Sequence, residues 1–250
     1  MDLAPAGPFT SPAEHPPTLD GRALSRHGLM LLGYQRTRNI SRNSRLAWEA
    51  GDDGPLAAEV AARGEEIFSG AVAEIWQEYR PMRDYLRATG RHPATAIDIG
   101  CGQAIADAFL LRDFGCHLTL VDIEQTEGQY HLWNDQGSGY ASLAEARAFL
   151  QTNGASPDRL VTVNPRHTPE AVAALSADLV TSSYSCGFHY PIAEYLGLML
   201  ATVAQGGVVV LDLRRRYQRN PDSALTSLLS ESRQSVISEE PKAQRVAFHL

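Results

Sequence analysis

One stretch near the middle of the chain constrains the fold more than any other. Residues 96–104 begin as an apolar run, carry one carboxylate at Asp98 and then break on two glycines. A run with helical spacing follows, and a second apolar run, 118–123, carries another carboxylate, Asp122. A strand, a glycine turn, a helix and a second strand form a βαβ unit, which predicts a parallel sheet.

The two glycines of this turn, Gly100 and Gly102, let a ligand approach the backbone closely, and the start of the following helix offers unpaired N–H groups. Asp122 ends the second strand about 20 residues later, where a carboxylate suits the two hydroxyls of a ribose. A dinucleotide-binding turn has a third glycine at the position of Ile105. The bulky Ile105 argues against a pyrophosphate site, so a nicotinamide oxidoreductase is the disfavoured alternative.

The segment Asp98-Ile99-Gly100-Cys101-Gly102 resembles the first motif of the class I methyltransferases, which use S-adenosylmethionine. The resemblance extends from about Tyr79 to the C-terminus. It implies that Asp98 and the turn approach the methionine part of this cofactor, that Asp122 binds the ribose and that Ile123 lies against the adenine. The cofactor-binding residues predicted on this basis are Asp98, Gly100, Cys101, Gly102, Gln103, Asp122, Ile123 and Ser183.

Composition and charge narrow the range of partners. The 250 residues carry a net charge of −7 and the pI is about 5.6, which disfavours binding to a nucleic-acid backbone, because that needs a basic surface. No apolar run approaches the length of a bilayer span, and no signal peptide is evident. The three cysteines lack C-x-x-C spacing, as is typical of reduced thiols. We expect a cytoplasmic protein without a nucleic-acid or membrane partner; its oligomeric state is unknown.

Three segments are predicted. Residues 1–20 are rich in proline and should form a mobile tail. Residues 21–92 should form a helical N-terminal extension or cap, with an interruption at Pro81. Its basic residues between 36 and 45 form either a solvated helical face or part of a lid over the ligand. Residues 93–250 should form the class I methyltransferase domain.

Further apolar runs predict the rest of the sheet. Buried strands are expected at 160–163, 177–183 and 208–213, and two alternating runs, 234–238 and 245–250, predict a hairpin. The fold class is therefore α/β, a Rossmann-like seven-stranded doubly wound sheet that is mostly parallel, with a C-terminal antiparallel hairpin and an N-terminal helical cap.

The acceptor side is predicted from the fourth strand and from an insertion. Methyl transfer to an alcohol needs a group that removes the hydroxyl proton. The segment Ser185 to Pro191 resembles that of sugar O-methyltransferases, as does the aromatic insertion at 124–140. Under this resemblance His189 is the first candidate for the general base, with His131 and Tyr184 behind it. The alternative for His189 is a turn residue packed between aromatic neighbours.

The sequence differs from the family pattern after the third strand, and it shows no metal-binding motif. Related enzymes place an acid after the third strand to bind adenine, whereas this chain has Asn164. The histidines and cysteines form no recognisable metal-binding set. We predict an S-adenosylmethionine-dependent methyltransferase for a small molecule, with a sugar or glycan hydroxyl as acceptor. The alternatives are a methyltransferase for another natural product and a non-catalytic partner subunit that binds the cofactor.

Overall fold

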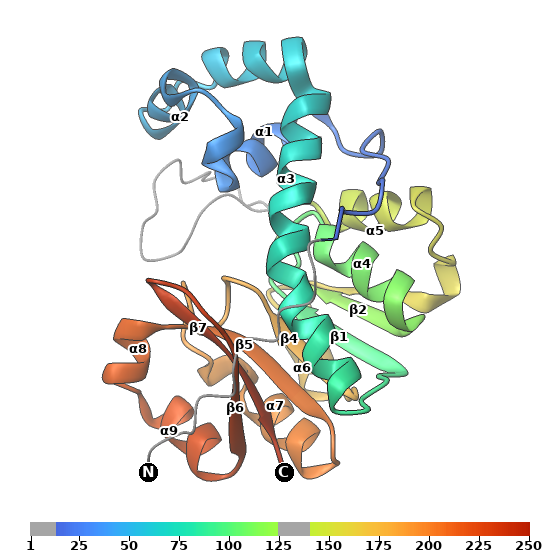
Figure 1. Cartoon of the computed structure of the whole chain (residues 1–250), viewed down its shortest axis with the longest axis vertical. Coiled ribbons are helices and arrows are strands. Elements are labelled where there is room, and N and C mark those ends of the chain that lie inside the picture. The colour runs from blue at the N-terminus through green and yellow to red at the C-terminus, as the bar shows by residue number, and fades with distance from the viewer. Residues whose placement is uncertain (1–13, 125–140) are drawn as a thin grey trace.

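The computed structural model describes residues 14–124 and 141–250 and contains one seven-stranded sheet in the order β3-β2-β1-β4-β5-β7-β6 (Figure 1). The first five strands in the chain pair in parallel, and β7 is antiparallel to both β5 and β6. This arrangement confirms the predicted fold class. The strands are β1 (Thr95–Ile99), β2 (His117–Val121), β3 (Leu160–Val163), β4 (Leu179–Ser182), β5 (Val208–Arg214), β6 (Arg233–Glu239) and β7 (Ala243–His249).

Helices cover both faces of the sheet, as a doubly wound sheet requires because its parallel strands are apolar on both sides (Figure 1). One core packs the second half of α3 together with α4 and α5 on one face, and another packs α6, α7 and α9 on the other face. The helices are α1 (Arg26–Gln35), α2 (Arg42–Glu49), α3 (Gly54–Ala88), α4 (Ile105–Phe114), α5 (Leu143–Thr152), α6 (Pro169–Ala173), α7 (Leu196–Ala204), α8 (Arg215–Arg219) and α9 (Ser223–Ser230).

The strand residues alternate between the two faces, which decides where the polar groups of β1 point. Ala96 belongs to the core beneath α3, α4 and α5, whereas Ile97 and Ile99 belong to the core on the α7 side. Because side chains two residues apart share a face, Asp98 lies on the same side as Ala96, toward α4. The first acidic residue of the motif is therefore directed between the sheet and a helix.

Helix α3 corrects the prediction of a break at Pro81. The helix runs through Pro81, and its non-helical residue is Arg63 instead. Proline in a helix interior costs about 3 kcal/mol, and burial of one large apolar side chain returns about 1.5–3 kcal/mol. The turns on either side of Pro81 bury Tyr79, Met82 and Leu86 against the sheet, and this packing outweighs the cost.

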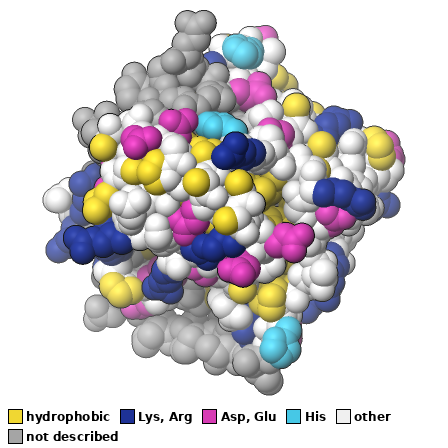
Figure 2. All heavy atoms as spheres, turned by 90° about the horizontal axis from the view of Figure 1, so that it is seen from above, with side chains coloured by type: hydrophobic (Ala, Val, Ile, Leu, Met, Phe, Trp, Pro, Cys, Tyr) yellow, Lys and Arg dark blue, Asp and Glu magenta, His cyan; other side chains and the backbone are white. Residues whose placement is uncertain are grey.

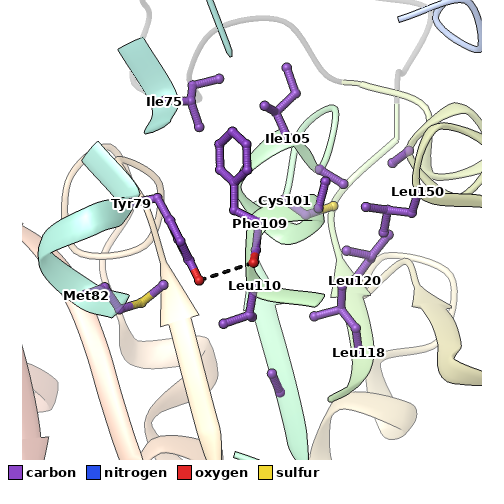
Figure 3. Close-up of a cluster of buried hydrophobic side chains, with 14 of the residues drawn as sticks. Ile75, Tyr79, Met82, Cys101, Ile105, Phe109, Leu110, Leu118, Leu120 and Leu150 are labelled. Carbon is purple, nitrogen blue, oxygen red and sulfur yellow. Dashed lines mark hydrogen bonds between the residues drawn. The ribbon is translucent and has the colours of Figure 1, made fainter. Parts of the chain in front are cut away.

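Figure 3 shows how the second half of α3 packs on the βαβ unit. Tyr79 and Met82 approach from α3, while Ile105 and Phe109 approach from α4. The Tyr79 hydroxyl donates to the Phe109 carbonyl oxygen at 3.3 Å. The predicted boundary between residues 92 and 93 thus falls between elements that share one core, and the division into segments stays a prediction.

The described part of the N-terminal segment contacts the helices. The Glu14 carbonyl accepts a hydrogen bond from the Trp76 indole, and the Glu14 carboxylate forms an ion pair with Arg83 at 2.6 Å. Residues 1–13 of the predicted mobile tail, and residues 125–140 of the predicted insertion, lie outside the described residues. In the two described ranges, no helix combines the length and the apolar character needed to cross a bilayer.

Candidate active site

A cavity of about 290 Å³ lies at the carboxyl ends of β1, β2 and β4. Ligands of open α/β sheets bind at this edge, where the strand order reverses. The cavity brings together every predicted cofactor-binding residue and two of the three candidate bases, His189 and Tyr184. His131, the third candidate, lies outside the described residues.

The glycine turn after β1 forms the floor of this cavity. Gly100 and Gly102 have φ values of +79° and +55°, and the Gly100 N–H donates to the Val121 carbonyl at 2.7 Å. A Cβ on Gly100 would overlap the Ser185 side chain, whereas a Cβ on Gly102 would meet nothing within 4 Å. The turn therefore packs against the β4 loop at Gly100 and leaves open space for a ligand above Gly102.

Asp122 is held in place by the same turn. The Gly102 N–H donates to Asp122 Oδ2 at 2.8 Å, and the Cys101 Sγ lies 4.0 Å from that oxygen. Burial raises the pKa of Asp122 to about 6, although the hydrogen bond from Gly102 opposes the shift. Burial also raises the pKa of Cys101, so this thiol stays protonated. Asp122 can thus accept hydrogen bonds from a diol while one of its oxygens is fixed.

Asp98 is the second carboxyl at the cavity. Its exposed fraction is 5%, and its Oδ1 has no hydrogen-bond partner among the described residues. Burial, with the neighbouring carboxyl of Asp107, raises the pKa of Asp98 well above its usual value. The Asp98 carboxyl lines the cavity and forms no ion pair among the described residues, so it can receive a cationic or hydrogen-bond-donating group of a ligand.

The remaining predicted cofactor contacts differ in their orientation. Ile123 and Ser183 line the cavity. The Gln103 amide also lines it but donates to the Gly28 carbonyl at 3.4 Å, which ties the glycine turn to α1. Asn164 accepts from the Arg166 N–H at 3.0 Å and donates to Glu124 at 3.4 Å, so its side chain links the segment after β3 to the segment after β2.

The β4 loop supplies the two candidate bases. His189 is partly buried, and burial together with Arg214 and Arg216 lowers its pKa to about 4. Its imidazole is therefore neutral at physiological pH and able to accept a proton. Tyr184 has a φ of +52°, its hydroxyl donates to Glu240 Oε1 at 2.7 Å, and burial raises its pKa. Tyr184 therefore stays protonated at physiological pH.

The charged residues at or beneath the cavity that sequence reasoning missed include Asp107 and Glu78. Asp107 lies in the first turn of α4, and Glu78 lies on α3 and forms an ion pair at 2.9 Å with Arg36, at the end of α1. Burial raises the pKa of Glu78, and Arg36 opposes that shift. Arg36 and Glu78 also line a second, adjoining cavity of about 340 Å³. The predicted basic face of residues 36–45 thus turns at least Arg36 toward the cavity.

The outer surface above the cavity carries charges of both signs. In the view onto the N-terminal helices, acidic and basic side chains alternate with apolar ones over the coloured, described residues (Figure 2). Among the described residues, no group of three or more His, Cys, Asp or Glu side chains is arranged to hold a metal ion.

Three features identify the fold type. They are the strand order, the C-terminal antiparallel hairpin, and the glycine turn between β1 and α4, with Asp98 in β1 and Asp122 after β2. The chain has the class I methyltransferase fold. No protein-family model matches the sequence, and no curated protein matches it.

Solved structures that resemble the chain include several methyltransferases. A predicted O-methyltransferase from Nostoc punctiforme PCC 73102 matches with a TM-score of 0.45 and 12% identity, over 70% of this chain and 56% of the other. The bifunctional kinase-methyltransferase WbdD matches with a TM-score of 0.42 and 20% identity, over 71% and 38%. A mutant of MtNAS matches with a TM-score of 0.49 and 13% identity, over 89% and 69%.

These similarities are distant, and the topology of the sheet is what identifies the fold. The chain spans 56% of the length of the O-methyltransferase and 38% of that of WbdD. The ligands and substrates of those proteins are not assigned to this chain. Its activity is inferred from its own site.

Proposed function

We propose that this protein transfers a methyl group from S-adenosylmethionine to a hydroxyl group of a small molecule, with a sugar or glycan as the favoured acceptor. The observation that carries the proposal is the pairing of Asp98 and Asp122 on either side of the glycine turn, in one cavity with His189. Each part of this cofactor has a matching group in the cavity wall.

The residues at the turn fit an adenosyl amino acid. Asp122 keeps one oxygen for the ribose hydroxyls while Oδ2 accepts from Gly102. The Asp98 carboxyl in the cavity wall suits the ammonium group of the amino acid, and the open space above Gly102 admits the chain between them. We assign the adenine to the side of Ile123, although Asn164 donates to Glu124 and does not line the cavity.

When bound, S-adenosylmethionine supplies a methyl group on a positively charged sulfur, which leaves as a neutral thioether. The protein then has to hold the acceptor oxygen in line with that methyl group, at about 3–3.5 Å, and keep water out. His189 accepts the hydroxyl proton in this proposal, because its imidazole is neutral above its lowered pKa of about 4. Tyr184 lines the acceptor side beside it.

A sugar acceptor is favoured by the resemblance of residues 185–191 and by the groups on the acceptor side. The adjoining cavity presents the rings of Tyr184 and Phe188 together with the carboxylates of Glu78 and Glu240. Aromatic rings pack on the apolar face of a sugar ring, and carboxylates accept hydrogen bonds from its hydroxyls. Another natural product with a hydroxyl group would use the same groups, and it is kept as the alternative acceptor.

Calorimetric titration tests the cofactor assignment without knowledge of the acceptor. S-adenosylhomocysteine should bind to the protein and NAD should not. Tight binding of NAD with no binding of S-adenosylhomocysteine would reject the proposal. A panel of free sugars, nucleotide sugars, glycans and phenolic natural products, incubated with labelled methyl donor, then identifies the acceptor class.

A non-catalytic subunit that binds the cofactor is the second candidate. It is favoured by one observation: a base with a pKa near 4 drives proton transfer only weakly at neutral pH. This candidate predicts that S-adenosylhomocysteine binds while no label reaches any member of the panel. The predicted cytoplasmic location, like the expected lack of nucleic-acid and membrane partners, stays a prediction.

A further inference from the structure

Beneath the cavity, two buried carboxyl groups lie where β1 and α4 pack together. Asp98 extends from β1 toward the α4 side of the sheet, and Asp107 lies in the first turn of α4. Their exposed fractions are 5% and 1%. Each carries one buried carboxyl oxygen without a hydrogen-bond partner among the described residues, Asp98 Oδ1 and Asp107 Oδ2, and the charge of Asp107 raises the pKa of Asp98. Two ionised carboxylates that interact in a site shielded from water repel each other strongly. One of them must therefore hold a proton.

The surroundings of the pair supply little positive charge. Arg245, the cation that acts on Asp98, is engaged at 2.6 Å with Asp212. The titratable groups that act on the pair from neighbouring elements are Asp122 after β2, Cys101 in the turn and Cys116 before β2. Each of these three groups is either neutral or negatively charged, so none of them contributes positive charge to the pair. The pair is thus a buried acidic site without a resident counter-ion.

The two carboxyls differ in their environments. Asp107 lies at the N-terminus of α4 and receives a backbone hydrogen bond, both of which favour its ionised form. Asp98 lies within β1 and has no support from a helix end, and burial together with the charges of Asp107 and Asp122 raises its pKa. In the empty cavity, the proton therefore belongs mainly to Asp98 and the negative charge mainly to Asp107.

We propose that Asp107 is a positioning residue for the cofactor, which takes over the shared proton when the ammonium group of the cofactor binds to Asp98. The O–H bond on Asp98 breaks and an O–H bond on Asp107 forms, while the electron pair stays on the Asp98 oxygen. The ammonium group gives up no proton. Asp98 then meets the ligand as a carboxylate that Asp107 orients by a hydrogen bond. This inference rests on the proposed function, because it assumes a ligand with an ammonium group.

The pH dependence of binding follows from the direction of the shifts. Burial raises the pKa of Asp107 to about 7, and burial together with the charge of Asp107 raises that of Asp98 well above its usual value. Below that pH the pair takes up a second proton, which has to leave before an ammonium group can bind. The affinity for S-adenosylhomocysteine should therefore fall by up to about tenfold per pH unit as the pH drops below about 7.

Two variants of Asp107 separate a positioning role from a structural one. In Asp107→Asn the amide still donates to Asp98 but adds no negative charge, so the pKa of Asp98 falls. The affinity of this variant for S-adenosylhomocysteine at about pH 8 should stay within about threefold of the wild-type affinity. The pH below which the affinity falls should be at least about one unit lower in the variant than in the wild type. Asp107→Ala removes the donor and should weaken binding about tenfold or more.

A second probe controls for Asp122, whose pKa of about 6 also affects the pH dependence of binding. 5′-Methylthioadenosine has the ribose and the adenine but lacks the amino acid, so Asp107 should not affect its affinity. Identical pH profiles of wild type and Asp107→Asn with S-adenosylhomocysteine would overturn the proposal. So would an equal loss of affinity for both probes in Asp107→Ala, which would indicate a purely structural role.

Carboxyl titration by NMR tests the shared proton in the free protein. In wild type with 13C-labelled aspartate, at least one aspartate carboxyl should titrate near or above pH 7, and Asp107→Asn should abolish that titration. If no carboxyl titrates there, the pair does not share a proton and the inference fails, even where the variant does not fold. If S-adenosylhomocysteine binds at no pH while the NMR titration is as expected, the proposed function has failed and the shared proton stands.

Discussion

The two sides of the cavity, which we propose hold the cofactor and the acceptor, are built in different ways. The cofactor side comes from one βαβ unit, and its two acids, Asp98 and Asp122, are joined by a single helix and strand. The acceptor side brings together Arg36, Glu78 and His189, which are distant in the sequence and belong to two helices and a loop. Local sequence therefore determines the first side, whereas long-range packing and buried charges determine the second.

The largest expected effect concerns the ion pair behind the acceptor side. Arg245 and Asp212 are both buried, with donor–acceptor distances of 2.8 and 2.6 Å, and Asp212 also accepts from the Tyr184 N–H. Arg245→Met leaves the Asp212 carboxylate uncompensated, so the free energy of unfolding should fall by about 3–5 kcal/mol in urea denaturation.

The matched control is Arg215→Met, which breaks an exposed ion pair with Glu239 and should cost less than about 1 kcal/mol. If Arg245→Met costs no more than this control, buried charge does not hold the acceptor side together. The double variant Arg245→Met with Asp212→Leu should recover part of the lost stability, because no unpaired charge remains.

The next effect concerns turnover and depends on identification of the acceptor. His189→Ala should lower the rate of methyl transfer about a hundredfold if His189 is the base, with an unchanged affinity for S-adenosylhomocysteine. His167→Ala, at an exposed position outside the cavity, serves as the control. Full activity of His189→Ala would assign this residue to packing beside Phe188, whose ring centroid lies 4.8 Å from its own.

A smaller effect is expected on the cofactor side. Asp122→Ala removes the carboxylate beside the glycine turn and should weaken binding of S-adenosylhomocysteine by about 1.5–3 kcal/mol, as is typical of a hydrogen bond to a charged group. Calorimetry with the exposed-site variant Asp158→Ala in parallel provides the control. An unchanged affinity in Asp122→Ala would refute its predicted role.

The smallest effect tests the contact between the two sides. Gly100→Ala combines a positive φ with overlap on Ser185, whereas Gly154→Ala has a positive φ of +94° and open space. Both should lose about 1–2 kcal/mol of stability from the backbone conformation, and Gly100→Ala should lose about 1 kcal/mol more. Adding Ser185→Gly should remove this excess; if it does not, the turn and the β4 loop are not in close contact.

Much of the fold could be predicted because its signals are local. The βαβ unit, the buried strands and the final hairpin follow from apolar runs. Asp222, a residue type that favours helix N-caps, accepts from the Leu225 N–H at 2.8 Å. The break expected at Pro81 was wrong because tertiary packing overrode a local preference. Helix α8, directly after β5, was not predicted, because Arg215–Arg219 has no apolar periodicity.

The candidate site also has one part that could be predicted from the sequence and one part that could not. Asp98, the glycine turn and Asp122 could be located because a known motif contains them. Asp107 could have been noticed as a lone acid in an otherwise apolar helix start, although spacing alone does not place it against Asp98. The Arg36–Glu78 ion pair carries no such signal, since α1 and α3 meet only after the chain has folded.

Helix α3 has a consequence for any attempt to produce the sheet as a separate fragment. Trp76, Tyr79 and Leu86 lie before residue 93 and are almost completely buried in the core of the sheet. A polypeptide that starts at residue 93 would expose the sheet surface that these side chains cover and should aggregate. A fragment that starts near the kink at Arg63 keeps this covering and is the shorter one to attempt.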